Sequence, residues 1–233
     1  MKQILFDALK GCPADYAEIR FEENDGSNFS YRGKALETAS SRRYNNGLIR
    51  ACVNGGWGNC EFATLENLRE KVFEACRDAA LVGKEKTRLA EYDIIPDLIH
   101  EAKFVNDFRG ISFDDKIQLL QNYNDIILSS DSKIESSTVN YSERIRTVYF
   151  ASTKGIYHKK ELPMMVLALT AISREGDQVQ YSTESFSSTD DFNVFLDRDE
   201  IVLETAQRAA ALLKAPKCEG GKHTVILRPD FAG

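Results

Sequence analysis

Strict alternation of apolar and polar residues constrains this chain more strongly than any other feature of its sequence. Residues 17–22 read Ala-Glu-Ile-Arg-Phe-Glu, which is the pattern of a strand with one buried face. Turn-forming residues follow at 24–26, 32–34, 45–47 and 55–58, and Asn and Gly in such turns tolerate positive φ. We therefore predict an antiparallel meander, with four hairpin connections, before residue 63.

Helical periodicity predicts one short N-terminal helix and three long helices. The predicted helices cover about residues 2–10, 65–81, 113–128 and 200–213. Thr64 and Ser112 are the expected N-caps of the second and third helices, and Gly83 is expected to end the second.

A second β-rich region follows the third helix. Its predicted elements are a strand at 138–151, a turn at 153–155, a strand at 164–172, a turn at 174–177, a polar loop at 182–191 and a last strand at 223–227. Residues 164–172 are apolar at both parities, which predicts a central strand covered on both faces. Together the elements predict an α+β fold with one or two antiparallel sheets.

Composition excludes several classes of protein. The net charge is −6, whereas a nucleic-acid-binding domain usually carries a basic patch, so direct nucleic-acid binding is not expected. No stretch approaches the roughly 18 apolar residues of a membrane helix, and the N-terminus lacks the features of a secretory signal. We expect a cytoplasmic protein without a membrane partner.

The five cysteines are Cys12, Cys52, Cys60, Cys76 and Cys218, without a C-x-x-C pair. Cys52 and Cys60 could face each other across a hairpin and form a disulfide. In a chain without a signal peptide, reduced thiols are the favoured interpretation.

Several local strings, in this order, resemble the TldD/PmbA family over essentially the whole chain. They are residues 14–20 (Ala-Asp-Tyr-Ala-Glu-Ile-Arg), 55–58 (Gly-Gly-Trp-Gly), 141–155 from Tyr-Ser-Glu to Ala-Ser-Thr-Lys-Gly, and the alanine-rich helix before 215–216 (Ala-Pro) and 224–227 (Thr-Val-Ile-Leu). The resemblance implies residues 1–215 as an N-terminal α+β domain, either whole or as subdomains 1–83 and 112–215 joined by an irregular 84–111. Residues 216–233 would begin a C-terminal metallopeptidase domain.

The same resemblance implies an activity and partners. In TldD-like members a helix after this point carries H-E-x-x-x-H, whose histidines bind zinc together with a distant cysteine, and zinc lowers the pKa of its bound water. The implied function is cleavage of unfolded or leader peptides in a chamber built by a homo- or hetero-oligomer of family subunits. Residues 1–233 lack that motif, so we expect them to be inactive alone. The alternative is a noncatalytic PmbA-like partner or a peptide-binding scaffold.

No residue of the chain is predicted to be catalytic, cofactor-binding or metal-binding. His100-Glu101 resembles the start of a zinc motif, but Phe104 and Val105 stand where a second histidine would be needed. His158 is expected to face solvent or pack on the sheet. His223 either supports zinc ligands from a distance or, as we favour, is an ordinary histidine at a strand edge.

The predicted sheet suggests one further role. An exposed edge of an antiparallel sheet can accept an extended peptide as an additional strand. Alternatively, loops or a partner subunit cover these edges, and the sequence does not choose between the two.

Overall fold

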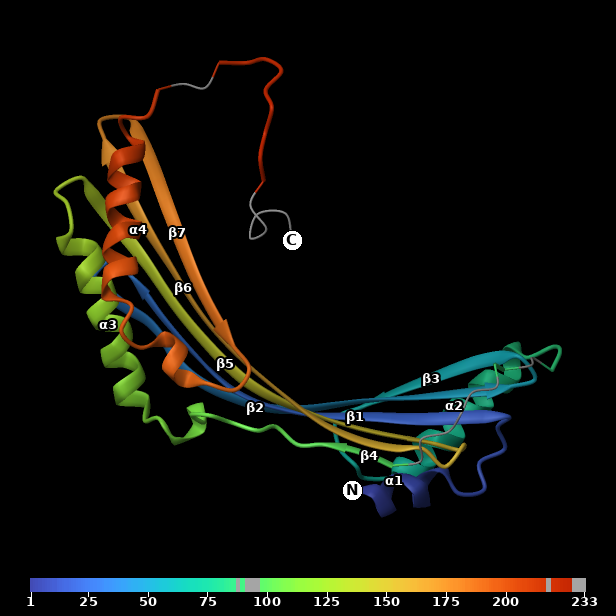
Figure 1. Cartoon of the computed structure of the whole chain (residues 1–233). Helices are drawn as coiled ribbons and strands as arrows, with labels where there is room; N and C mark the ends of the chain where they lie inside the picture. The colour runs from blue at the N-terminus through green and yellow to red at the C-terminus, as the bar shows by residue number, and fades with distance from the viewer. Residues whose placement is uncertain (87–88, 91–96, 217–218, 228–233) are drawn as a thin grey trace.

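A single sheet of seven strands forms the centre of the molecule (Figure 1). The computed structural model describes residues 1–86, 89–90, 97–216 and 219–227. The strands are β1 Tyr16–Arg32, β2 Ala35–Val53, β3 Gly56–Phe62, β4 Asp97–His100, β5 Ile134–Ser152, β6 Tyr157–Glu175 and β7 Gln178–Ser188. Their order is β3-β2-β1-β5-β6-β4, with β7 also paired to β6. Every pairing is antiparallel except that of β4 with β6, and the predicted α+β class is confirmed.

The predicted set of one short and three long helices is also confirmed. The helices are α1 Lys2–Leu9, α2 Leu68–Val82, α3 Phe113–Ser129 and α4 Asp199–Leu212, with 3-10 turns η1 Phe108–Gly110 and η2 Phe192–Phe195. The Ser112 side chain caps α3 by accepting a hydrogen bond from the Asp115 N–H, 3.1 Å away. The Thr64 cap was wrong, because α2 begins later, after Asn67 in a left-handed conformation.

The strands are much longer than the turn residues suggested. Residues 24–26 lie inside β1 and pair with residues 42–44 of β2, and residues 45–47 lie inside β2 and pair with residues 21–23 of β1. The hairpin at Gly33 is present and has positive φ there. Two of the four predicted hairpin connections were therefore wrong, because pairing with both neighbouring strands keeps β1 extended throughout.

The sheet bends into an arch, and its two faces differ (Figure 1). Helices lie on the convex side, which we call the outer face: α3 and α4 at one end, α1 and α2 at the other. The opposite, concave side is the inner face, and its side chains along β5 are exposed or half-buried at residues 138–150. No helix of the described residues covers the inner face (Figure 1).

Two cores lie on the outer face, one at each end of the arch. One packs α3 and α4 against residues that include Phe29 and Tyr141. The other packs α1 and α2 against residues that include Ile19 and Ala151. Strands β1 and β5 contribute to both cores, so the same two strands join both ends of the molecule.

Three strand predictions in the second half need correction. On β6, the outer-face residues Met165 and Leu167 are fully buried, whereas Met164 is 43% exposed, so only one face is covered. The polar segment 182–191 is largely strand β7, whose polar residues suit an edge position with one paired neighbour. Residues 223–227 form no strand. Across the described residues, no helix is both long and apolar enough to cross a membrane.

Candidate functional site

Strand β6 has a stretch of unpaired edge between β4 and β7, which both lie on the same side of it. β4 pairs with residues 157–160 of β6, and β7 pairs with residues 165–175 on the same side. Residues 161–164 pair with β5 on their other side but with neither β4 nor β7. We call residues 161–164 and the cavity beside them the edge notch.

The cavity of the edge notch has a volume of about 870 Å³. Its lining comes from the segment after β4, the bare part of β6 and the segment after β7: Ile99, His100, Glu101, Ala102, Lys103, Glu161, Leu162, Pro163, Thr189 and Asp190. A cavity of this size at a sheet edge has room for an extended peptide segment.

The Glu161 carboxylate fixes one wall of the notch. It accepts a hydrogen bond from the Ala102 N–H at 3.1 Å and forms an ion pair with Lys159 at 2.9 Å. The hydrogen bond from Lys159 lowers the pKa of Glu161 below its ordinary value, and that of the Ala102 N–H acts in the same direction. The Ala102 hydrogen bond, together with the ion pair of Lys159 with Glu101 at 3.6 Å, links the segment after β4 to β6.

Pro163 and the segments after β4 and β7 limit the pairing of other strands with this edge. Pro163 has no N–H and is tolerated in sheets mainly at edges. The Val105 N–H donates to the Asp190 carbonyl oxygen at 2.9 Å. This hydrogen bond ties the segment after β4 to the segment after β7. Pro163 was the one signal in the sequence that could have marked this edge, and the sequence reasoning missed it.

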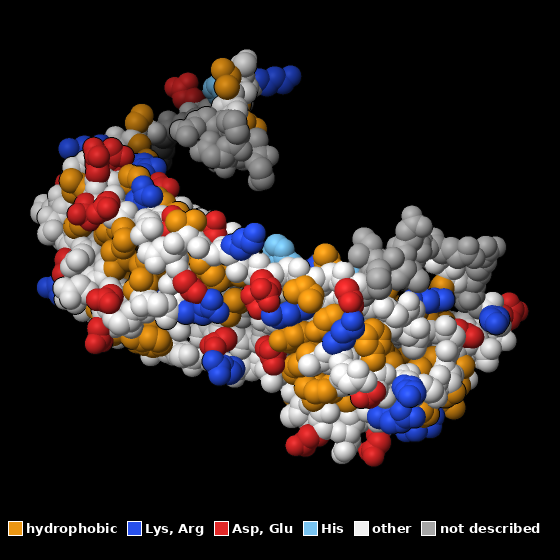
Figure 2. Space-filling model, turned by 60° about the horizontal axis from the view of Figure 1, so that its bottom comes forward, with side chains coloured by type: hydrophobic (Ala, Val, Ile, Leu, Met, Phe, Trp, Pro, Cys, Tyr) orange, Lys and Arg blue, Asp and Glu red, His pale blue; other side chains and the backbone are white. Residues whose placement is uncertain are grey.

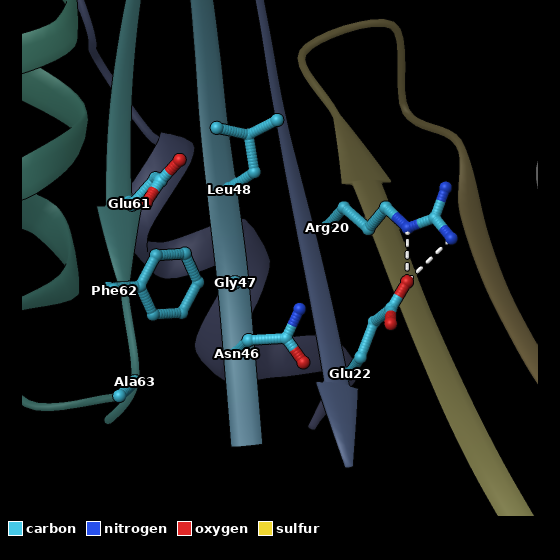
Figure 3. Close-up of a pocket in the computed structure, with 8 residues that line it drawn as sticks. All are labelled: Arg20, Glu22, Asn46, Gly47, Leu48, Glu61, Phe62 and Ala63. Carbon is cyan, nitrogen blue, oxygen red and sulfur yellow. Dashed lines mark hydrogen bonds and ion pairs between the residues drawn. The ribbon is translucent and has the colours of Figure 1, made fainter. Parts of the chain in front are cut away.

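A second hollow lies on the inner face near β3 (Figure 3). It has a volume of about 670 Å³ and is lined by Arg20, Glu22, Asn46, Gly47, Leu48, Glu61, Phe62 and Ala63. The Phe62 ring lies beside Gly47, where a Cβ atom would come within 2.2 Å of it. Arg20 donates to Glu22 at 2.7 Å, so these two charges of the hollow compensate each other.

Charged side chains gather on the outer face between the two cores (Figure 2). The innermost pair is Lys116 and Glu143, whose side chains are 3% and 5% exposed and 2.8 Å apart. Tyr141 donates to the other oxygen of Glu143 at 2.8 Å, and burial, followed by the Glu143 charge, raises the pKa of Tyr141. This closed network has no free acid or base, and we assign it a structural role.

The three histidines lie apart. His100 is exposed on β4 beside the edge notch. His158 is half-buried on β6, its ring 5.9 Å from that of Phe150, and its Nε2 atom is buried without a hydrogen-bond partner. His223 lies outside any strand and contacts the Glu219 carbonyl at 3.2 Å. Within the described ranges, no group of three or more His, Cys, Asp and Glu side chains could hold a metal ion.

Cysteines Cys12, Cys52, Cys60 and Cys76 are free thiols. Cys52 pairs with Trp57 and Cys60 with Ile49 in the β2–β3 ladder, so the two thiols point to opposite faces and cannot form the disulfide considered from sequence. Burial, with a smaller effect of Cys12, raises the pKa of the Cys76 thiol to about 11. Cys218 lies outside the described residues.

Known proteins match this chain in sequence over most of these elements. Two family models match, the PmbA/TldA metallopeptidase domain 1 at residues 17–80 and the PmbA/TldA metallopeptidase central domain at residues 106–215. A metalloprotease of Synechocystis sp. is 31% identical over 220 residues, which are 94% of this chain and 48% of that protein. The chain therefore spans about half the length of the curated relatives it matches.

Two solved structures have a similar fold. A protein of Thermotoga maritima described as a modulator of a DNA gyrase superimposes with a TM-score of 0.72 at 19% identity, covering 88% of this chain and 46% of that one. TldE from Thermococcus kodakarensis superimposes with a TM-score of 0.66 at 16% identity, covering 90% of this chain and 47% of that one. At these identities the similarity concerns the fold alone.

Proposed function

Because this chain belongs to the TldD/PmbA metallopeptidase family, we propose that it forms the peptide-holding part of a metallopeptidase. Its role is to bind an unfolded or leader peptide and to present the chain for cleavage. The edge notch carries this proposal, since residues 161–164 are the part of β6 whose outer edge has no strand beside it. The neighbouring cavity of about 870 Å³ gives the peptide room.

Strand addition suits a substrate that is unfolded. A peptide that pairs with β6 would be bound mainly through its backbone, so many sequences could be accepted. Leu162 and Met164, which are 37% and 43% exposed, offer apolar surface to alternate side chains of such a peptide. The Ala102–Glu161 hydrogen bond holds the opposite wall in place, which lowers the cost of ordering the site upon binding.

The metal is proposed to come from elsewhere. The described side chains do not fit a metal ion, since they contain no group of three or more ligand residues. We propose that the zinc ligands lie outside residues 1–233 and that family subunits assemble as a homo- or hetero-oligomer around them. Residues 1–215 would act as the domain that builds the chamber and a subunit interface.

The proposal that residues 1–233 bind the peptide while the zinc ligands lie elsewhere is tested by measuring binding and cleavage separately. Purified residues 1–233 are expected to bind an unfolded peptide, measured by fluorescence anisotropy, and to leave it intact. Hydrolysis that a chelator abolishes would show that this chain carries the catalytic metal and would overturn the proposal. If the assembled protein also binds but never cleaves, the noncatalytic partner role replaces the peptidase role.

A variant that fills the notch locates the peptide. Thr189 is exposed in the notch lining, and Thr189→Trp is expected to weaken peptide binding about tenfold by occupying the cavity. Ala80→Trp, on an exposed position of α2, is the matched control and should leave binding unchanged. Equal affinity of the two variants would place the peptide elsewhere.

A further inference from the structure

Four basic side chains lie on the inner face at the middle of the arch. In the strand register, Arg42 on β2 and Arg144 on β5 lie on either side of Gly26 on β1. Arg146 lies opposite Asn24 in the next inner-face position of β5. Lys160 follows on β6, opposite Val148. We call Arg42, Arg144, Arg146 and Lys160 the basic row.

The basic row lacks compensating acids. The acidic residues Glu18 and Glu22 on the same face are ion-paired with Arg50 and Arg20. In contrast, Arg144, Arg146 and Lys160 form no ion pair with any described residue. Arg42 stacks on Tyr44, 4.7 Å from the ring centroid, and also keeps its charge uncompensated. A chain with a net charge of −6 thus gathers unpaired positive charge on one face.

The curvature of the sheet strengthens this charge. Side chains on a concave surface point toward one another, and a hollow lined by one sign of charge focuses the electrostatic potential. Gly26 has no side chain between Arg42 and Arg144, whose strands are two spacings, or about 10 Å, apart. Guanidinium groups on both sides of such a gap can bind a carboxylate with two parallel hydrogen bonds.

The basic row borders the edge notch. Arg146 lies opposite Leu162, and Arg144 lies opposite Met164, and both β6 residues belong to residues 161–164. A peptide strand paired with these residues would direct alternate side chains toward the inner face, where the basic row lies. The row would therefore be within reach of the side chains of a bound peptide.

We propose that the basic row selects peptides with acidic side chains, an inference that rests on the proposed function. The occupant is an extended acidic peptide that also carries apolar residues, because exposed Leu162 and Met164 border the row. A nucleic acid fits less well. The basic row consists of four residues and borders the exposed apolar side chains of Leu162 and Met164, whereas nucleic-acid sites track many phosphates with basic residues.

Binding of two matched peptides tests the inference. The purified protein is titrated into a fluorescein-labelled, unstructured peptide of serine, glycine and leucine with glutamate at every second position, and into the same peptide with glutamine instead. The glutamate peptide is expected to bind about tenfold more tightly at low salt, and this advantage should shrink as salt is added.

Charge-removing variants assign the preference to the basic row. Arg144→Gln/Arg146→Gln should reduce the preference for glutamate to within about twofold. Arg77→Gln/Lys84→Gln removes the same charge from exposed positions in α2 and just after it and should retain the preference. Circular dichroism of each variant confirms that the fold is unchanged.

The outcomes separate this inference from the proposed function. If both peptides bind equally and Thr189→Trp weakens both, the notch holds peptides and the basic row has no selective role. If neither peptide binds, both proposals fail. If a single-stranded oligonucleotide displaces the glutamate peptide at lower concentration than unlabelled glutamate peptide does, the row is a nucleic-acid surface and the inference is wrong.

Discussion

Gly26 and Arg144 lie opposite each other on β1 and β5, so close that a Cβ atom on Gly26 would be 3.0 Å from the Cβ atom of Arg144. The same added atom would lie 2.4 Å from the Glu143 carbonyl oxygen. Gly26 lies on the concave side of the arch, where a bent sheet brings neighbouring residues together. Glycine at this position permits the curvature that forms the inner face.

Replacement of Gly26 by alanine is expected to destabilise the protein. The new methyl group meets backbone that cannot rotate away, so Gly26→Ala should lower the free energy of unfolding by about 2 kcal/mol. Gly110→Ala, where nothing lies within 4 Å of the added atom, is the control. Urea denaturation measures both, and an equal effect of the two variants would show that Gly26 does not limit the curvature.

The buried ion pair on the outer face should be sensitive to loss of one partner. Lys116→Met leaves the Glu143 carboxylate buried without its cation, which should cost about 3–5 kcal/mol. Lys116→Met/Glu143→Gln removes both charges, keeps an acceptor for Tyr141, and should recover at least half of that loss.

An exposed ion pair provides the comparison. Arg174 pairs with Glu135, and both side chains are nearly half exposed, so Arg174→Met should cost less than about 1 kcal/mol. If Lys116→Met is no more destabilising than Arg174→Met in urea denaturation, Lys116 and Glu143 do not form a buried ion pair.

Acid should weaken the wall of the edge notch. Because the pKa of Glu161 is lower in the folded protein than its ordinary value of 4.5, its contribution to stability is complete above about that pH. The contribution is lost as the pH falls through the lower, folded-state value.

Glu161→Gln measures that contribution. The difference in unfolding free energy between wild type and Glu161→Gln should be about 1 kcal/mol or less at neutral pH. It should diminish below pH 4.5, which is the ordinary pKa of this group. A difference that grows on acidification would contradict the interaction with Lys159.

The two cores are expected to unfold together. β1 carries Ile19 in one core and Phe29 in the other, so unfolding of either end would expose part of the same strands. Residues 1–215 should therefore show one calorimetric transition, and both Ile19→Ala and Phe29→Ala should shift that transition by several degrees. Two transitions, each affected by one variant, would indicate separate subdomains 1–83 and 112–215.

The helices could be predicted from sequence more accurately than the strands. Ser112 and Asp115 marked the start of α3, because a cap depends on residues close in sequence. Residues 24–26 and 45–47 were assigned to turns, because their composition suits turns. In the structure, Gly26 and Gly47 instead make room for Arg144 and for the Phe62 ring, which are contacts between distant residues.

The edge notch could not be predicted in the same way. It exists because β4 and β7 stop short of each other along β6, and neither end point has a local sequence signal apart from Pro163. The apolar residues of β6 predicted burial on both faces, but local composition does not say which face the helices will cover. Met164, at 43% exposure, is the clearest case.

A crystal structure of the protein with a bound unfolded peptide would show whether the peptide pairs with β6 at the edge notch. We expect a peptide strand hydrogen-bonded to residues 161–164 of β6, with acidic side chains toward Arg144 and Arg146. A peptide that contacts only parts of the protein outside residues 1–233 would contradict this expectation.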